Sequence, residues 1–212
     1  MFNGKRAIGL VTGDQLESPE VVLADMPAFD YFYVTENDAR LREGATFRQL
    51  LDHVFSLDPS EATFYAHGKG VRYPQDHTVW DWARVMYEEN LGDVQRTDRI
   101  LGTNPCAGVF RMHGDAFDRT RYYPWHYSGS FYWFHNASLF SFPNWEDIDQ
   151  TWYCVEPYLS QFFSVRQAAC LGYEDIGSLY DKYTWDKLCR GRGRMFGAAP
   201  FSSVKPVFVE SK

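Results

Sequence analysis

A histidine and a lysine follow directly on a short apolar run in this sequence. Residues 63–66 (Thr-Phe-Tyr-Ala) have the β-branched and aromatic character of a buried strand, and His67, Gly68, Lys69 and Gly70 end it. The two glycines allow the backbone to turn sharply and to approach a ligand closely. Because ligands of open α/β sheets gather at the carboxyl ends of strands, we expect His67 and Lys69 to meet an anionic ligand. A tight turn with a surface lysine is the alternative interpretation.

A carboxylate in the second half of the chain, Glu156, stands directly before Pro157. Proline is tolerated at the first position of a helix, and apolar residues with helical spacing continue to residue 166, so we expect a helix to begin here. The positive end of a helix stabilises a carboxylate, whose side chain can then point into a cleft. An ordinary acidic residue at a helix N-terminus is the alternative.

The elements that would position these residues follow from hydrophobic periodicity. The apolar stripe of residues 46–57, with Thr46 and Gln49 in a capping-box pattern, predicts a helix, and residues 78–91 predict a second one. The uninterrupted apolar run 31–34 is typical of a strand that is covered on both faces. We expect strands over residues 5–12, 29–35, 63–66, 105–112 and 131–134. Successive β-to-α units predict an α/β fold of Rossmann-like type.

The 212 residues predict one domain with a core of its own, which we expect over residues 1–189. Periodicity fades from residue 172 onward, and residues 190–212 are expected to form an extended tail or loop. Arginines alternate with glycines at Arg190, Arg192 and Arg194, where a phosphate or nucleic-acid backbone could bind. The formal net charge of −7 nevertheless argues against tight binding to duplex nucleic acid or to an anionic membrane.

The four cysteines indicate reduced thiols. Their wide spacing fits neither a zinc knuckle nor a small disulfide scaffold, no secretory signal precedes them, and no apolar run is long enough to span a bilayer. They are Cys106, Cys154, Cys170 and Cys189. These features predict a cytoplasmic protein.

Two motifs together resemble a glycosyltransferase-like family of bacterial and viral proteins. The first is the segment 64–70, which contains His-x-Lys-Gly, and the second is the block 126–133, His-Tyr-Ser-Gly-Ser-Phe-Tyr-Trp, with Trp-Asp-Trp at 80–82 between them. The resemblance covers roughly residues 30–165. It implies a GT-A type nucleotide-diphospho-sugar transferase fold, which is Rossmann-like with a mixed central sheet flanked by helices.

The resemblance also implies a transfer reaction, in which a sugar passes from a nucleotide-diphosphate donor to an acceptor hydroxyl. Lys69 and His67, helped by the amides of Gly68 and Gly70, would stabilise the leaving diphosphate, because the usual Asp-x-Asp metal site is missing here. Use of a divalent ion, Mg or Mn, therefore stays open. Glu156 would be the base that takes the acceptor proton, or would orient the acceptor.

The remaining site residues are assigned on the same resemblance. The nucleoside would be held at the end of the first strand by Thr12, Gly13 and Asp14, and the sugar and acceptor by His126, Ser128, Gly129 and Trp133. Ser130 and Tyr132 depart from the asparagine and tryptophan that are usual in the second motif.

Other functions stay open on the sequence. One is a carbohydrate- or nucleotide-binding module of the same fold without catalysis, and another is a viral enzyme that glycosylates DNA bases. The acidic pairs Asp115 with Asp118 and Glu174 with Asp175 are further candidates, the first for a metal and the second for the base. Histidines at 67, 113, 126 and 135 would suit a metal hydrolase, although none has a local ligand spacing. Dinucleotide-binding, Walker and nucleophile-elbow motifs do not occur.

Overall fold

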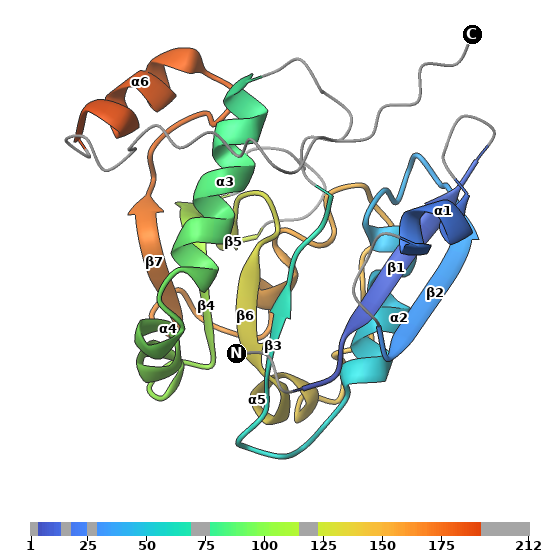
Figure 1. The fold of residues 1–212 in the computed structure, drawn as a ribbon. Coiled ribbons are helices and arrows are strands. Elements are labelled where there is room, and N and C mark those ends of the chain that lie inside the picture. The colour runs from blue at the N-terminus through green and yellow to red at the C-terminus, as the bar shows by residue number, and fades with distance from the viewer. Residues whose placement is uncertain (1–3, 14–17, 25–28, 69–76, 115–122, 192–212) are drawn as a thin grey trace, which may run out of the picture.

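The computed structural model describes residues 4–13, 18–24, 29–68, 77–114 and 123–191, and it is a mixed α/β protein (Figure 1). A parallel pair is formed by strands β1 (Ala7–Thr12) and β2 (Tyr31–Glu36). A five-stranded sheet contains β3 (Ala62–Tyr65), β4 (Cys106–His113), β5 (Trp125–Tyr127), β6 (Tyr132–His135) and β7 (Ala168–Glu174). The helices are α1 (Pro19–Ala24), α2 (Gly44–Val54), α3 (His77–Leu91), α4 (Val94–Leu101), α5 (Asn136–Phe140), α6 (Lys182–Gly191) and the 3-10 helix η1 (Tyr158–Gln161).

Strand directions bring several carboxyl ends to one edge of the five-stranded sheet. β6 lies between β3 and β4 and is antiparallel to both, whereas β7 is parallel to β4 on its other side. β3, β4 and β7 therefore run in one direction, and their carboxyl ends, like that of β1, face the top of Figure 1. The turn that leads into β6 lies at this same edge. A sheet edge of this kind is where α/β proteins gather ligands.

The first two strands do not join the larger sheet through hydrogen bonds, contrary to the single central sheet that the sequence suggested. β1 pairs with β2 and is covered by α2 instead. A side chain at Gly9 would lie 2.4 Å from Thr46 of α2, so glycine allows strand and helix to pack closely. Thr46 is accordingly buried inside the helix and is not its cap, because α2 begins at Gly44.

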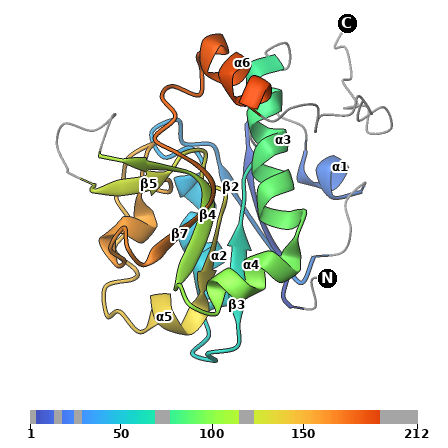
Figure 2. The same cartoon turned by 90° about the vertical axis from the view of Figure 1, so that its left-hand side faces the viewer.

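Both faces of the larger sheet are buried. Figure 2 shows α3 and α4 on one side of it and α5 with η1 on the other. The apolar stripe of α3 that the sequence predicted, including Val79, Trp82 and Met86, is buried. The opposite core uses Phe47 and Leu51 of α2 against Tyr65 and other sheet residues. Aromatic side chains dominate the cores on both faces of the sheet, so most of the aromatic content fills the interior.

Three local expectations are wrong. β2 alternates: its outer side chains Phe32 and Val34 are 58% and 38% exposed, so the apolar run does not mark a strand covered on both faces.

The helix expected from Glu156 is only the short 3-10 helix η1, because side chains bond the backbone here. Ser160 donates to the carbonyl of Pro157, and Gln167 accepts from the amide of Ser164. Residues 190 and 191, which were expected in an extended tail, belong to α6 instead.

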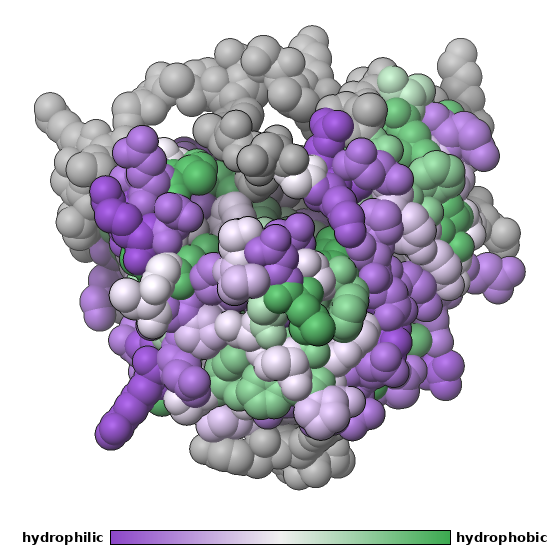
Figure 3. Space-filling view, turned by 90° about the horizontal axis from the view of Figure 1, so that it is seen from below, coloured by the Kyte–Doolittle hydropathy of each residue, from purple (hydrophilic) through white to green (hydrophobic). Residues whose placement is uncertain are grey.

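Among the described residues, no helix combines the length and the apolar character needed to cross a membrane. The molecule seen from below, at the amino ends of β3 and β7, intersperses hydrophobic with hydrophilic surface (Figure 3). Such interspersion is ordinary for a protein surface and gives no reason to place a site at this end.

Candidate functional site

The candidate site is built around a strained turn between β5 and β6. The amide of Ser130 donates to the carbonyl of Tyr127 at 3.1 Å, and Gly129 at the third position of the turn has φ +95°. A Cβ atom on Gly129 would lie 2.6 Å from the sulfur of Met86. Ser130 is fully buried and also has a positive φ, +58°, which costs an L-residue free energy. Strain of this kind persists where surrounding contacts impose it, which is common at functional sites.

Two of the side chains expected in the site meet at this turn. The carboxylate of Glu156 accepts a hydrogen bond from the amide of Gly129 at 3.0 Å. The Nε2 atom of His67 lies 2.9 Å from the carbonyl oxygen of Gly129. Both side chains are half-buried. The structure thus joins β3, the β5–β6 turn and the segment before η1 at one residue.

The partner of His67 fixes the protonation of one ring nitrogen. A carbonyl oxygen can only accept, so the Nε2 atom of His67 must carry the proton and donate to Gly129. The ring packs against Phe131, with centroids 5.7 Å apart. His67 therefore uses its Nε2–H group to bind the backbone of the turn.

A second carboxylate, Glu43, was not among the residues expected from the sequence. Its Oε1 atom accepts from the hydroxyl of Ser130 at 3.4 Å, and Glu43 precedes the first residue of α2. Burial raises the pKa of the Cys154 thiol to about 12, and the negative charge of Glu43 contributes to this rise. The same charge adds to the burial that raises the pKa of Tyr65. Within the described ranges, no lysine or arginine lies at ion-pair distance from Glu43.

The chemistry available at this turn is that of two half-buried carboxylates with an imidazole. Carboxylates accept hydrogen bonds from hydroxyl groups, and one within reach of a reacting hydroxyl can remove its proton. Glu43 and Glu156 approach adjacent residues of the turn, Ser130 and Gly129. This arrangement suits a ligand rich in hydroxyl groups.

The other residues assigned from the second motif lie in or beside the turn, and two of them are buried. His126 is buried and its ring faces Tyr153, with centroids 5.6 Å apart. Ser128 is half-buried, and its amide donates to the carbonyl of Phe110. Trp133 is only 8% exposed, and its indole donates to the carbonyl of Asn90 at 3.3 Å. Trp133 thus packs the core between β6 and α3, beneath the turn.

Two of the residues assigned to the donor lie at the end of β1, whose sheet is not hydrogen-bonded to the sheet that carries this turn. Thr12 ends β1, where its hydroxyl donates to the carbonyl of Thr35, and Gly13 is exposed beyond it. Gly68 is exposed directly after His67. Asp14, Lys69 and Gly70 lie outside the described residues, as do Asp115 and Asp118.

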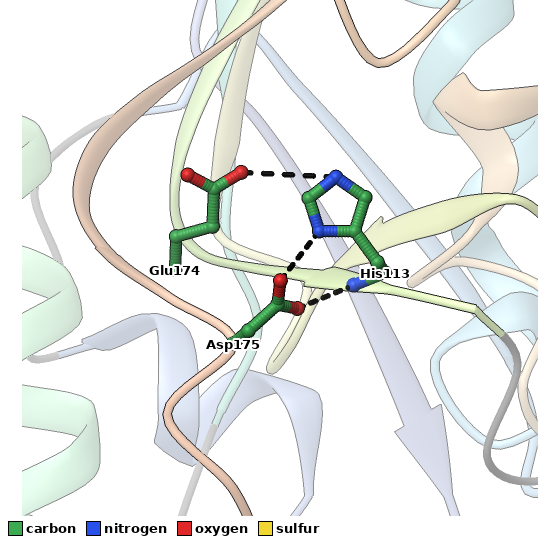
Figure 4. Close-up of side chains that lie close together, drawn as sticks. All are labelled: His113, Glu174 and Asp175. Atoms are coloured by element: carbon green, nitrogen blue, oxygen red, sulfur yellow. Dashed lines mark hydrogen bonds and ion pairs between the residues drawn. The ribbon is translucent and has the colours of Figure 1, made fainter.

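A separate cluster joins the carboxyl ends of β4 and β7 (Figure 4). Asp175 accepts from the amide of His113 at 2.8 Å and lies 2.6 Å from its Nδ1 atom. The hydrogen bond from the amide of His113 holds the pKa of Asp175 below its usual value, and the ring of His113 contributes to this lowering. Arg111 donates to Glu174 and to the carbonyl oxygen of Ala168.

This cluster suits a clasp between strands better than a cation site. Ligand atoms of His113, Glu174 and Asp175 lie within 4.8 Å of one another, and all three side chains are exposed. Arg111 already pairs with Glu174, however, and His113 engages Asp175. Mg²⁺ and Mn²⁺ prefer oxygen ligands, and a neighbouring guanidinium opposes a cation. The second acidic pair of the sequence thus has a structural explanation.

The thiols of the described cysteines are consistent with the expected reduced state. Cys106 and Cys154 are buried, Cys170 is half-buried, and none of these three forms a disulfide. Burial raises the pKa of Cys106 to about 12. Cys154 has the same raised pKa, and thiols with pKa values this high are inert at neutral pH, so Cys106 and Cys154 have a structural role.

Comparisons with protein-family models, with curated proteins and with solved structures returned no match for this chain.

Proposed function

We propose that this protein is a glycosyltransferase, which moves a sugar from a nucleotide-diphosphate donor to an acceptor hydroxyl. The observation that carries the proposal is the meeting of Glu156 and His67 on the backbone of Gly129. Both motifs of the sequence resemblance contribute to this contact. The mixed sheet, with antiparallel β6 between β3 and β4, supports a GT-A type arrangement.

In the proposed reaction, Glu156 is the general base. The oxygen of the acceptor hydroxyl attacks the anomeric carbon of the donor sugar, the bond from this carbon to the diphosphate oxygen breaks, and the hydroxyl proton passes to the carboxylate of Glu156. The hydrogen bond from the amide of Gly129 keeps the carboxylate oriented. Glu43, which contacts the next residue of the turn, Ser130, is placed to accept hydrogen bonds from further hydroxyls.

The leaving diphosphate would be stabilised by the segment that follows β3. Lys69 has this role in our proposal, and it lies outside the described residues. His67 fixes the start of this segment to the turn through Gly129. We expect Lys69→Ala to depress turnover strongly and to leave the unfolding transition unchanged, because the substitution removes the point charge that would stabilise the diphosphate.

A panel of nucleotide-diphospho sugars tests the proposal. The protein would be incubated with each donor, with and without Mg²⁺ or Mn²⁺, in the presence of simple sugars as acceptors, and release of nucleoside diphosphate would be measured. We expect at least one donor to be consumed. Donor binding without any consumption would contradict the proposed transfer reaction and favour a binding module. Comparing the incubations with and without Mg²⁺ or Mn²⁺ decides whether an ion is used.

A further inference from the structure

A second group of polar and aromatic residues lies beside the carboxylates of the turn. Arg42 precedes Glu43 in the chain, and its guanidinium carbon lies 4.7 Å from the centre of the Trp152 ring. Trp152 is 42% exposed and stands four positions before Glu156. The two segments that supply Glu43 and Glu156 therefore also supply this cation–π pair.

The two segments are packed against each other at a close contact. A Cβ atom on Gly44 would lie 2.5 Å from the sulfur of Cys154. Because Gly44 follows Glu43 and Cys154 lies between Trp152 and Glu156, this contact holds both carboxylates and the cation–π pair in one region. The absence of a side chain at Gly44 makes that approach possible.

The guanidinium groups of Arg42 and Arg48 both lie over tryptophan rings, and they differ in their other contacts. Arg48 lies over Trp145 at the same distance, 4.7 Å, but it also pairs with Asp52 and Glu146 at 3.0 Å each. In the described part of the chain, no carboxylate lies at ion-pair distance from Arg42. Arg48 has the contacts of a structural pair, whereas Arg42 keeps its donor groups available.

The backbone of Arg42 is held in a strained conformation. Its φ is +51°, in the left-handed region that costs a bulky L-residue free energy. Its amide donates to the carbonyl of Asp38, and its carbonyl accepts from Ala45, so the turn before α2 fixes it there. A strained residue whose charged group is oriented by an exposed ring fits a role in ligand binding.

We propose that Arg42, oriented by Trp152, binds an anionic group on the acceptor, so that the acceptor is a sugar carrying a phosphate or a carboxylate. A planar guanidinium binds both anions through paired hydrogen bonds, and an exposed indole stacks on a sugar ring. Glu43 and Glu156 then face the hydroxyls of the same sugar. This assignment rests on the proposed transfer reaction, because it names the substrate of that site.

Direct binding tests the assignment without any donor. Calorimetry would compare methyl glucoside, methyl glucuronide and glucose 6-phosphate for the wild type, Arg42→Gln and Arg40→Gln. Arg40 is the matched control, since its side chain is 86% exposed and it pairs with Asp38 two positions earlier. We expect the wild type and Arg40→Gln to bind a charged sugar about tenfold more tightly than methyl glucoside, and Arg42→Gln to lose this preference.

Either of two results would overturn the assignment: an equal affinity of the wild type for all three sugars, or an undiminished preference in Arg42→Gln. The phosphate and carboxylate arms show which anion is preferred. Arg42→Lys keeps the positive charge but lacks the planar guanidinium, so it should retain part of the preference for charged sugars. This variant tests the assignment if Arg42→Gln does not fold. If the protein prefers charged sugars through Arg42 but consumes no nucleotide sugar, the proposed transfer reaction is contradicted while the anion-binding role of Arg42 is supported.

Discussion

The side chains of His67 and Glu156 are linked through one residue, because His67 donates to the carbonyl of Gly129 and Glu156 accepts from its amide. The two side chains come from segments far apart in the chain, one after β3 and the other before η1. Gly129 has φ +95° and lies in contact with α3. A small change in this turn should therefore act on both side chains at once.

Gly129→Ala tests the turn as the organising element. The new methyl group meets the sulfur of Met86 and requires a left-handed backbone, so we expect a loss of about 2 to 4 kcal/mol in the free energy of unfolding. Gly114→Ala is the matched control, because Gly114 has φ +73° but no atom within 4 Å of an added Cβ. Urea denaturation gives the free energy of unfolding lost to the left-handed backbone alone in Gly114→Ala, and to the backbone and the close contact together in Gly129→Ala. Equal losses would contradict the close contact at Gly129.

Gly44→Ala tests the contact between the two carboxylate-bearing segments. Alanine ordinarily stabilises a helix relative to glycine, but here its methyl group would lie 2.5 Å from the sulfur of Cys154. We expect a loss of about 1 to 3 kcal/mol, part of which Cys154→Ala should restore in the double variant. The measurement is a double-mutant cycle of unfolding free energies. Additive effects would show that the two residues do not touch.

The clasp between β4 and β7 predicts a pH dependence. The folded pKa of Asp175 is lowered by the amide and ring of His113, so its contribution to stability is present above the unfolded value, about 4, and is lost as the pH falls through the folded value. Asp175 is half exposed, and solvent reduces the effect. We expect urea midpoints to fall less between pH 5 and pH 3 in Asp175→Asn than in the wild type, with exposed Asp98→Asn as control. Parallel declines in all three proteins would refute this.

The sequence predicted the regular elements whose local pattern is clear, and it assigned to one site some residues that lie together. The buried stripe of α3 and the short strand before His67 are examples, since α3 follows a helical repeat and the strand has β-branched and aromatic residues. His67, Gly129 and Glu156 were all expected in one site, and the structure brings them together. Glu43 was missed because the capping pattern placed the start of α2 at Thr46, two residues beyond its first residue.

Other features depend on pairing that local sequence does not carry. β7 begins with small residues and contains Gly172, so its strand character comes from its place beside β4. The register irregularity at Gly108 and Val109 and the positive φ of Tyr173 lie on the two strands that lead to the contact between His113 and Asp175. The helix expected at Glu156 failed because the hydroxyl of Ser160 donates to the carbonyl of Pro157, and the side chain of Gln167 accepts from the amide of Ser164.

The most direct test of the transferase compares donor turnover in the wild type, Glu156→Gln and Glu61→Gln, with a donor that the wild type consumes. Glutamine can still accept from the amide of Gly129 but cannot take a proton, whereas Glu61 is an exposed residue before β3. We predict a loss of at least about 100-fold in Glu156→Gln, an unchanged unfolding midpoint, and wild-type turnover in Glu61→Gln. Turnover of Glu156→Gln equal to that of the wild type would contradict the role of Glu156 as the base.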